Sequence, residues 1–157
     1  MYKKLLFVIV TMFIGFCYNI NEVISYESEL FPKIINIIEN DHKKVAILYN
    51  DESVYVAQKL KNLINDNNYF LIHKDNFEPK NFKAVIFTYK NVDQNLINKL
   101  IKNKILILNI YSDAIKNSMI SIFIGLKIKP YININLIKMA NININPILLN
   151  IGEIYEK

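Results

Sequence analysis

Four segments of the chain are apolar without the polar alternation of a half-exposed strand. Each is short and rich in Val, Ile, Leu, Phe and Tyr, most of which favour strands. An apolar run of this kind is typical of a parallel sheet, because helices cover both of its faces. The pattern therefore predicts four buried strands, at residues 44–49, 69–73, 84–89 and 105–110.

Segments with helical spacing of apolar residues separate or precede these predicted strands. Leucine and isoleucine recur every three or four positions, which places them on one face of a helix. The predicted helices cover residues 29–38, with Pro32 in the first turn, 54–64 and about 92–103. Because strands and helices alternate, we expect an α/β fold: a single-domain three-layer sandwich around a mostly parallel sheet.

The rhythm changes after the fourth predicted strand. Residues 112–116 suit one helical turn. Two further strand-like segments, 119–124 and 127–132, then flank Gly125. Strands joined by so short a turn pair antiparallel. We therefore expect a C-terminal antiparallel hairpin and, as a whole, a mixed sheet.

Isoleucine and asparagine alternate twice in the last third of the chain. The first run closes the hairpin at Asn133, and residues 134–140 then return to helical spacing. Asn141 is a suitable helix C-cap, because asparagine adopts a positive φ more readily than most residues. The second run predicts an extended link into a final helix that starts at Pro146.

The N-terminus has the pattern of an export signal. Lys3 and Lys4 precede an apolar run, Leu5 to Tyr18, that is shorter than a membrane span. We expect a signal peptide over residues 1–25, cleaved before Tyr26. The expected location is the periplasm, with membrane contact only through the signal segment.

The folded domain is then expected over residues 26–157. Two alternatives stay open for the N-terminus. The apolar run can remain as an uncleaved anchor, or Cys17 can carry a lipid, although the bulky Phe16 stands where such a site has a small residue. Cleavage before Tyr26 leaves no cysteine, so the domain would form no disulfide.

Composition narrows the classes of partner. Hydrophobic residues make up 52% of the 157-residue chain, as in a folded globular protein. Its 19 basic residues are all lysine, against 14 acidic residues, which gives a net charge of +5. Without residues 1–25 the balance is 17 lysines against 13 acidic residues, or +4. These charges are scattered rather than clustered, so we expect no nucleic-acid partner.

The sequence offers no catalytic or metal-binding constellation. His42 and His73 stand apart, whereas a metal site needs clustered ligands. No glycine-rich turn follows the first predicted strand, so a dinucleotide cradle is missing. We expect no metal, no cofactor and no enzymatic activity. A hydrolase centred on Ser53 or Ser112 is the remaining enzymatic alternative, and it lacks an evident base.

One general site remains. In open parallel sheets, ligands bind at the carboxyl ends of the strands. Polar residues follow the predicted strands there and suit a small polar ligand or a partner segment; the other interpretation is that they are polar loop residues over a sheet edge. These candidate site residues are Asn50, Asp51, Ser53, Thr88, Tyr89, Ser112 and Asp113.

The C-terminal third resembles a known family. A strand ending in Ser112-Asp113 is followed by a second strand, by a strand closing on Asn133, by a helix and turn, and by a last helix with Leu148-Leu149. This order resembles the YfiR-like (DUF4154) family of small periplasmic proteins. In that comparison Asn133 and the Leu148-Leu149 pair match family residues, Asn141 replaces a common glycine, and Pro146 starts the closing helix.

The resemblance implies a periplasmic regulator without enzymatic activity. Such a protein contacts the periplasmic domain of an inner-membrane signalling protein, a diguanylate cyclase or sensor kinase, and so changes cyclic di-GMP output. A homodimer is also open. The alternative is a small-ligand-binding protein resembling one lobe of a periplasmic solute-binding protein. Aromatic residues considered for a partner surface are Tyr55, Phe77, Phe82 and Tyr131.

Overall fold

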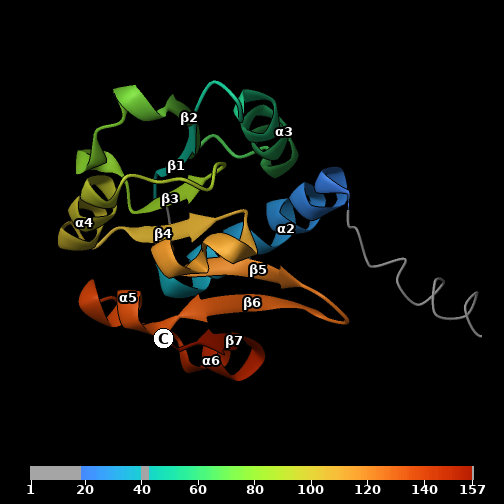
Figure 1. Cartoon of the computed structure of the whole chain (residues 1–157), viewed down its shortest axis with the longest axis vertical. Coiled ribbons are helices and arrows are strands. Elements are labelled where there is room, and N and C mark those ends of the chain that lie inside the picture. Colours follow the sequence, from blue (N-terminus) through green and yellow to red (C-terminus); the bar gives the residue numbers. More distant parts are fainter. Residues whose placement is uncertain (1–18, 40–42, 157) are drawn as a thin grey trace, which may run out of the picture.

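The computed structural model describes residues 19–39 and 43–156, and these form one α/β domain (Figure 1). Its elements, in chain order, are α2 (Ile20–Ile38), β1 (Val45–Tyr49), α3 (Val54–Ile64), β2 (Tyr69–His73), the 3-10 helices η1 (Lys74–Asn76) and η2 (Pro79–Asn81), β3 (Ala84–Phe87), α4 (Gln94–Lys102), β4 (Leu106–Asn109), the 3-10 helix η3 (Ser112–Asn117), β5 (Ile120–Ile124), β6 (Ile128–Asn133), α5 (Ile134–Met139), α6 (Pro146–Ile151) and β7 (Glu153–Tyr155).

All described strands belong to one sheet with the order β2-β1-β3-β4-β5-β6-β7. The pairs from β2 to β5 are parallel, and β5 and β6 form an antiparallel hairpin with Ile120 opposite Ile132. The predicted fold class, a mostly parallel sheet with a C-terminal antiparallel hairpin, is confirmed. The sequence did not predict β7, which adds parallel to β6 and carries the Glu153 partner of a 2.5 Å ion pair with Lys129.

The central strands are covered on both faces. Every residue of β3 and β4 is buried, as is every residue of β1 except Tyr49. In Figure 1, α2 passes behind β4 and β5, whereas η3 lies in front of them. This two-sided cover is the reason that these strands read as unbroken apolar runs.

The first described helix is longer than predicted. α2 begins at Ile20 rather than at residue 29, so Pro32 lies inside the helix and not in its first turn. Its buried face includes Ile24 and Phe31, both without solvent exposure, and α2 packs against α3. The helix extends upstream because these residues, spaced seven apart, continue the same buried face toward the N-terminus.

The predicted signal segment lies mainly outside the described residues. Its final part, residues 20–25, forms the start of α2, and the predicted cleavage point before Tyr26 falls within this helix. Among the described helices, none combines the length and the apolar character needed to cross a bilayer.

The two Ile-Asn runs form different elements, as predicted. Asn133 closes β6 and caps α5, with Oδ1 accepting a hydrogen bond from the Leu136 amide at 3.2 Å. Asn141 has a φ of 53°, the expected left-handed conformation, but the C-cap of α5 is Ala140, one residue earlier than predicted, and Asn141 is the residue that follows the cap. Asn145 caps α6, where Pro146 occupies the first turn. In α6, Leu148 is fully buried and Leu149 packs against the core.

Asn133 joins two parts of the fold. Its Nδ2 donates to the Ile115 carbonyl at 3.0 Å, in addition to the cap at the start of α5. We expect Asn133→Ala to lower the free energy of unfolding by about 2 kcal/mol, because it removes a helix cap and leaves a buried carbonyl without its donor. Urea unfolding of the variant measures this loss.

Asn143→Ala is the matched control for this substitution. Asn143 belongs to the second Ile-Asn run, and its side chain is exposed. We expect it to change the free energy of unfolding by less than about 0.5 kcal/mol. Equal losses in the two variants would contradict the structural role assigned to Asn133.

Candidate functional site

The order in which the strands are added to the sheet changes direction after β2, so the switch point lies between β1 and β3. The sheet grows outward from β1 to β2 on one side and from β3 onward on the other. At such a switch point the loops after the two adjacent strands, here β1 and β3, run in opposite directions and leave a crevice at the carboxyl ends of the strands. The segments that follow β1, β3 and β4 therefore form the walls of the candidate site.

Two adjoining cavities occupy this edge of the sheet. We call them the Tyr111 cavity and the Asp113 cavity, and together the crevice. The Tyr111 cavity has a volume of about 370 Å³ and is lined by Asn50, Glu52, Ser53, Val56, Thr88, Tyr89, Lys90, Asn91 and Tyr111. The Asp113 cavity has a volume of about 470 Å³ and is lined by Lys90, Asn91, Val92, Asp93, Asp113, Ala114, Lys116 and Asn117.

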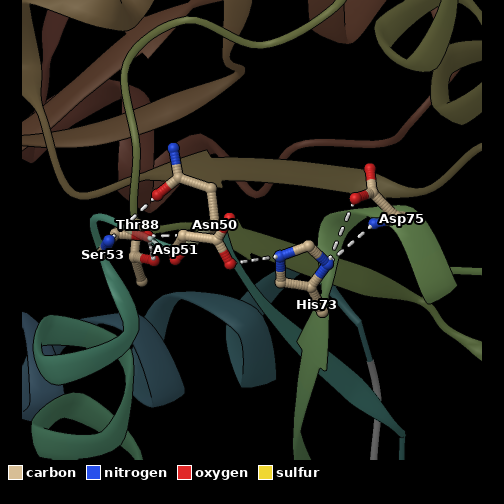
Figure 2. A network of polar contacts seen from close by, with 6 residues as sticks. All are labelled: Asn50, Asp51, Ser53, His73, Asp75 and Thr88. Atoms are coloured by element: carbon tan, nitrogen blue, oxygen red, sulfur yellow. Dashed lines mark hydrogen bonds and ion pairs between the residues drawn. The ribbon is translucent and has the colours of Figure 1, made fainter.

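A compact polar network holds the β1 side of the crevice (Figure 2). The Ser53 amide donates to Asn50 Oδ1 at 2.9 Å, and the Asn50 amide donates to Ser53 Oγ at 3.0 Å. Thr88 Oγ1 lies 3.0 Å from Ser53 Oγ and donates to the Leu48 carbonyl at 2.9 Å. These reciprocal bonds tie the turn after β1 to the end of β3 and fix the start of α3.

Asn109 fixes the segments that carry Tyr89 and Tyr111, after β3 and β4. Its buried side chain donates to the Tyr89 carbonyl at 3.1 Å and accepts from the Tyr111 amide at 2.9 Å. Burial, with a smaller contribution from Asp75, raises the pKa of Tyr89 to about 12. Tyr89 therefore keeps its proton at neutral pH and presents an uncharged hydroxyl.

Lys90 lies between the two cavities. Its Nζ is 2.6 Å from Asp113 Oδ2 and 5.0 Å from the centre of the Tyr111 ring. The hydrogen bond to Asp113 is the main cause that raises the pKa of Lys90. The Lys90 cation thus contacts both an aromatic face and a carboxylate at the boundary of the two cavities.

A second polar cluster lies at the ends of β1 and β2, outside both cavities (Figure 2). His73 Nε2 is 3.3 Å from Asp51 Oδ1, and His73 Nδ1 is 3.5 Å from Asp75 Oδ2. The first distance suits an ion pair, yet Nε2 makes no hydrogen bond of good geometry. The Asp51 side chain is 99% exposed, so water screens this contact and it contributes little.

Ser53 and His73 do not form a nucleophile–base pair. Ser53 Oγ makes hydrogen bonds with the Asn50 backbone and with Thr88 Oγ1, while His73 faces Asp51 and Asp75. Within residues 19–39 and 43–156, no cluster of three or more His, Cys, Asp or Glu side chains is arranged to hold a metal ion. The crevice is suited to binding through hydrogen bonds and charge.

The structure brings most of the predicted site residues together. Asn50, Ser53, Thr88 and Tyr89 line the Tyr111 cavity, and Asp113 lines the other. Asp51 turns toward His73 instead, and Ser112 begins η3 without lining either cavity.

The lining residues of the crevice that sequence reasoning missed include Lys90, Asn91 and Tyr111. A signal for them was present, since Lys90 and Tyr111 each follow a predicted buried strand directly and Asn91 comes one residue later. Lysine and asparagine are so frequent in this chain that their occurrence at a strand end did not distinguish them.

No family model and no curated protein matches this chain. Solved structures do match. The ABC domain in complex with L-Trp from Streptococcus pneumonia aligns over 84% of this chain with a TM-score of 0.60 and 11% identity. A conserved domain protein from Vibrio cholerae O1 biovar eltor aligns over 82% with a TM-score of 0.59 and 12% identity. This chain spans 62% and 60% of those structures, and identities this low show the shared fold alone.

A buried carboxyl group lies in α2, outside the lining of both cavities. Glu27 of α2 has no solvent exposure, and neither carboxyl oxygen has a hydrogen-bond partner among the described residues. Burial raises the pKa of Glu27 well above its usual value. The group also acts on Tyr111, whose pKa is raised mainly by burial and further by the Glu27 charge. Glu27 is therefore costly to ionise in the folded protein.

We expect Glu27 to make stability depend on pH. Below about pH 4.5 the group is protonated in both states. As the pH rises further, the unfolded chain releases the proton while the folded chain keeps it, so the free energy of unfolding falls until the pH passes the raised pKa. Each pH unit in that interval costs about 1.4 kcal/mol.

Glu27→Gln should remove this part of the pH dependence. Urea unfolding between pH 4 and pH 9 measures the slope for the wild type and the variant. Glu29→Gln serves as the control, because Glu29 lies on the exposed side of the same helix. If the Glu27→Gln and Glu29→Gln profiles have the same slope, Glu27 does not titrate as described.

Proposed function

We propose that this chain binds a small polar ligand in the crevice at the carboxyl ends of β1, β3 and β4. The observation that carries the proposal is the pair of adjoining cavities at the carboxyl ends of the strands, of which the Tyr111 cavity lies at the switch point between β1 and β3. Their volumes of about 370 and 470 Å³ fall within the usual range of small-molecule sites.

The chemistry of the walls supports the same proposal. Side chains that donate and accept hydrogen bonds lie beside the apolar surfaces of Val56 and Tyr111. The Asn50–Ser53–Thr88 network and Asn109 hold these walls in place before any ligand arrives. A site that is already ordered loses less conformational entropy when it binds.

The similarity to solved structures is consistent with a ligand-binding role. One of the similar structures is in complex with L-Trp, a molecule that cavities of this volume accommodate. The proposed role corresponds to a protein resembling one lobe of a periplasmic solute-binding protein, with residues 1–25 directing export.

Thermal unfolding with a panel of amino acids, sugars, nucleosides and organic acids tests this function. A ligand present at 100 times its Kd stabilises the folded state by about 2.7 kcal/mol. For a chain of this size that raises Tm by roughly 5–10 °C. Tyr111→Ala should abolish the shift, because it removes one wall of the cavity.

Tyr55→Ala is the control for this experiment, since Tyr55 is an exposed tyrosine that lines neither cavity. It should leave the shift unchanged. If no compound in the panel raises the Tm of the wild type, or if Tyr111→Ala responds as the wild type does, the proposed site is wrong.

A second candidate function is regulation of an inner-membrane signalling protein by direct contact. The favouring observation is the apolar tip of the β5–β6 hairpin, where Leu126 is 94% exposed and Phe123 and Ile128 are also exposed. The aromatic residues considered from the sequence fit this role less well. Phe77 is buried, Phe82 and Tyr131 are half-buried, and only Tyr55 is exposed.

This second function predicts a change in intracellular cyclic di-GMP when the chain is deleted. Complementation with the wild-type chain should restore the level, and Leu126→Ser should not, because it removes the exposed apolar contact. Met139→Ser is the control, since Met139 is exposed on α5, beyond the other end of β6 (Figure 1). An unchanged cyclic di-GMP level in the deletion strain would exclude this regulation.

A further inference from the structure

The Lys90–Asp113 ion pair crosses the crevice. Lys90 follows β3 and Asp113 lies in η3 after β4, so the pair joins the ends of two neighbouring strands. Both side chains line the Asp113 cavity, and Lys90 lines the Tyr111 cavity as well. A ligand that fills the crevice must therefore meet this pair.

The pair is easily separated. Its side chains are 52% and 64% exposed, and an ion pair between exposed residues contributes little to stability. Its contact of 2.6 Å nevertheless shows that a positive and a negative group face each other at hydrogen-bond distance. A ligand with one charge of each sign can separate this pair, because its anionic group then pairs with Lys90 and its cationic group pairs with Asp113.

The remaining charges of the crevice are nearly balanced. Lys116 adds to Lys90, and Asp93 and Glu52 add to Asp113. A strongly anionic or strongly cationic ligand gains little from such a lining, whereas a ligand with one charge of each sign complements it. The apolar surfaces of Val56 and Tyr111 lie on the far side of Lys90, where they suit an uncharged part of the same molecule.

We infer that Lys90 and Asp113 are the specificity-determining residues of the crevice and that its ligand is a zwitterion of the free α-amino acid class. The ligand carboxylate pairs with Lys90 and its ammonium group pairs with Asp113, while its side chain occupies the Tyr111 cavity. This inference rests on the proposed small-ligand function and names the class of ligand.

The test is titration calorimetry on the full chain with the twenty L-amino acids, followed by analogues of the one that binds most tightly. One analogue lacks the carboxylate and the other lacks the amino group. Each lost group removes a charge-assisted hydrogen bond, so each analogue should bind about 10- to 100-fold more weakly. Lys90→Gln and Asp113→Asn should each lower the affinity for the amino acid by the same factor.

Matched controls separate charge recognition from a change in net charge. Lys99→Gln and Glu156→Gln remove one charge of each sign at exposed positions outside both cavities. They should leave the affinity for the amino acid within about twofold of the wild type. Thermal unfolding without ligand shows whether the four variants remain folded.

The outcomes distinguish this inference from the proposed function. If either analogue binds as tightly as the amino acid, or if Lys90→Gln keeps wild-type affinity, the inference is overturned. The inference is also overturned if no amino acid binds while another class of metabolite gives a thermal shift that Tyr111→Ala abolishes. In that case the proposed function stands. If no compound of either panel binds, both are overturned.

Discussion

Burial of β1, β3 and β4 on both faces is the constraint from which the rest of the domain follows. An apolar strand in this position needs a covering element above and below, and its backbone groups need a strand on each side. The chain meets the first need with helices packed on the sheet: α3 contacts β1 and packs against α2, and α4 and η3 contact β4. The second need is met by the uninterrupted order from β2 to β7.

The same constraint explains where the crevice lies. Strands buried this completely cannot carry exposed polar groups, so hydrogen-bonding side chains are confined to the segments that follow them. Asn109 is the exception within a strand: it donates to the Tyr89 carbonyl after the neighbouring β3 and accepts from the Tyr111 amide after its own strand, β4. A rigid apolar sheet thereby supports a short polar rim, and the proposed ligand site lies in this rim.

Much of the architecture was predictable because its signals are local. The four apolar runs were assigned correctly as strands of a parallel sheet, and the two Ile-Asn runs as different elements that include the left-handed Asn141 and the position of Pro146. The prediction that all four strands are buried was wrong for β2, because it lies at the edge of the sheet with Phe70 and Leu71 exposed. The start of α2 was missed because the export pattern and the buried face of the helix overlap at Ile24. β7 was missed because a three-residue strand depends on its pairing with β6, which no local pattern encodes. Lys90 and Tyr111 gain their meaning only when two strand ends meet in space.

The two edges of the sheet differ in a way that bears on self-association. At one edge β7 offers three residues, and the Lys129–Glu153 pair bridges it to β6. At the other edge β2 offers five residues, with Phe70 and Leu71 exposed. Short, charged edges resist pairing with another chain, whereas longer apolar edges invite it. Where the native state is weakened, a strand of another chain would therefore add to the sheet at β2, and the sheet would grow from that edge and not from β7.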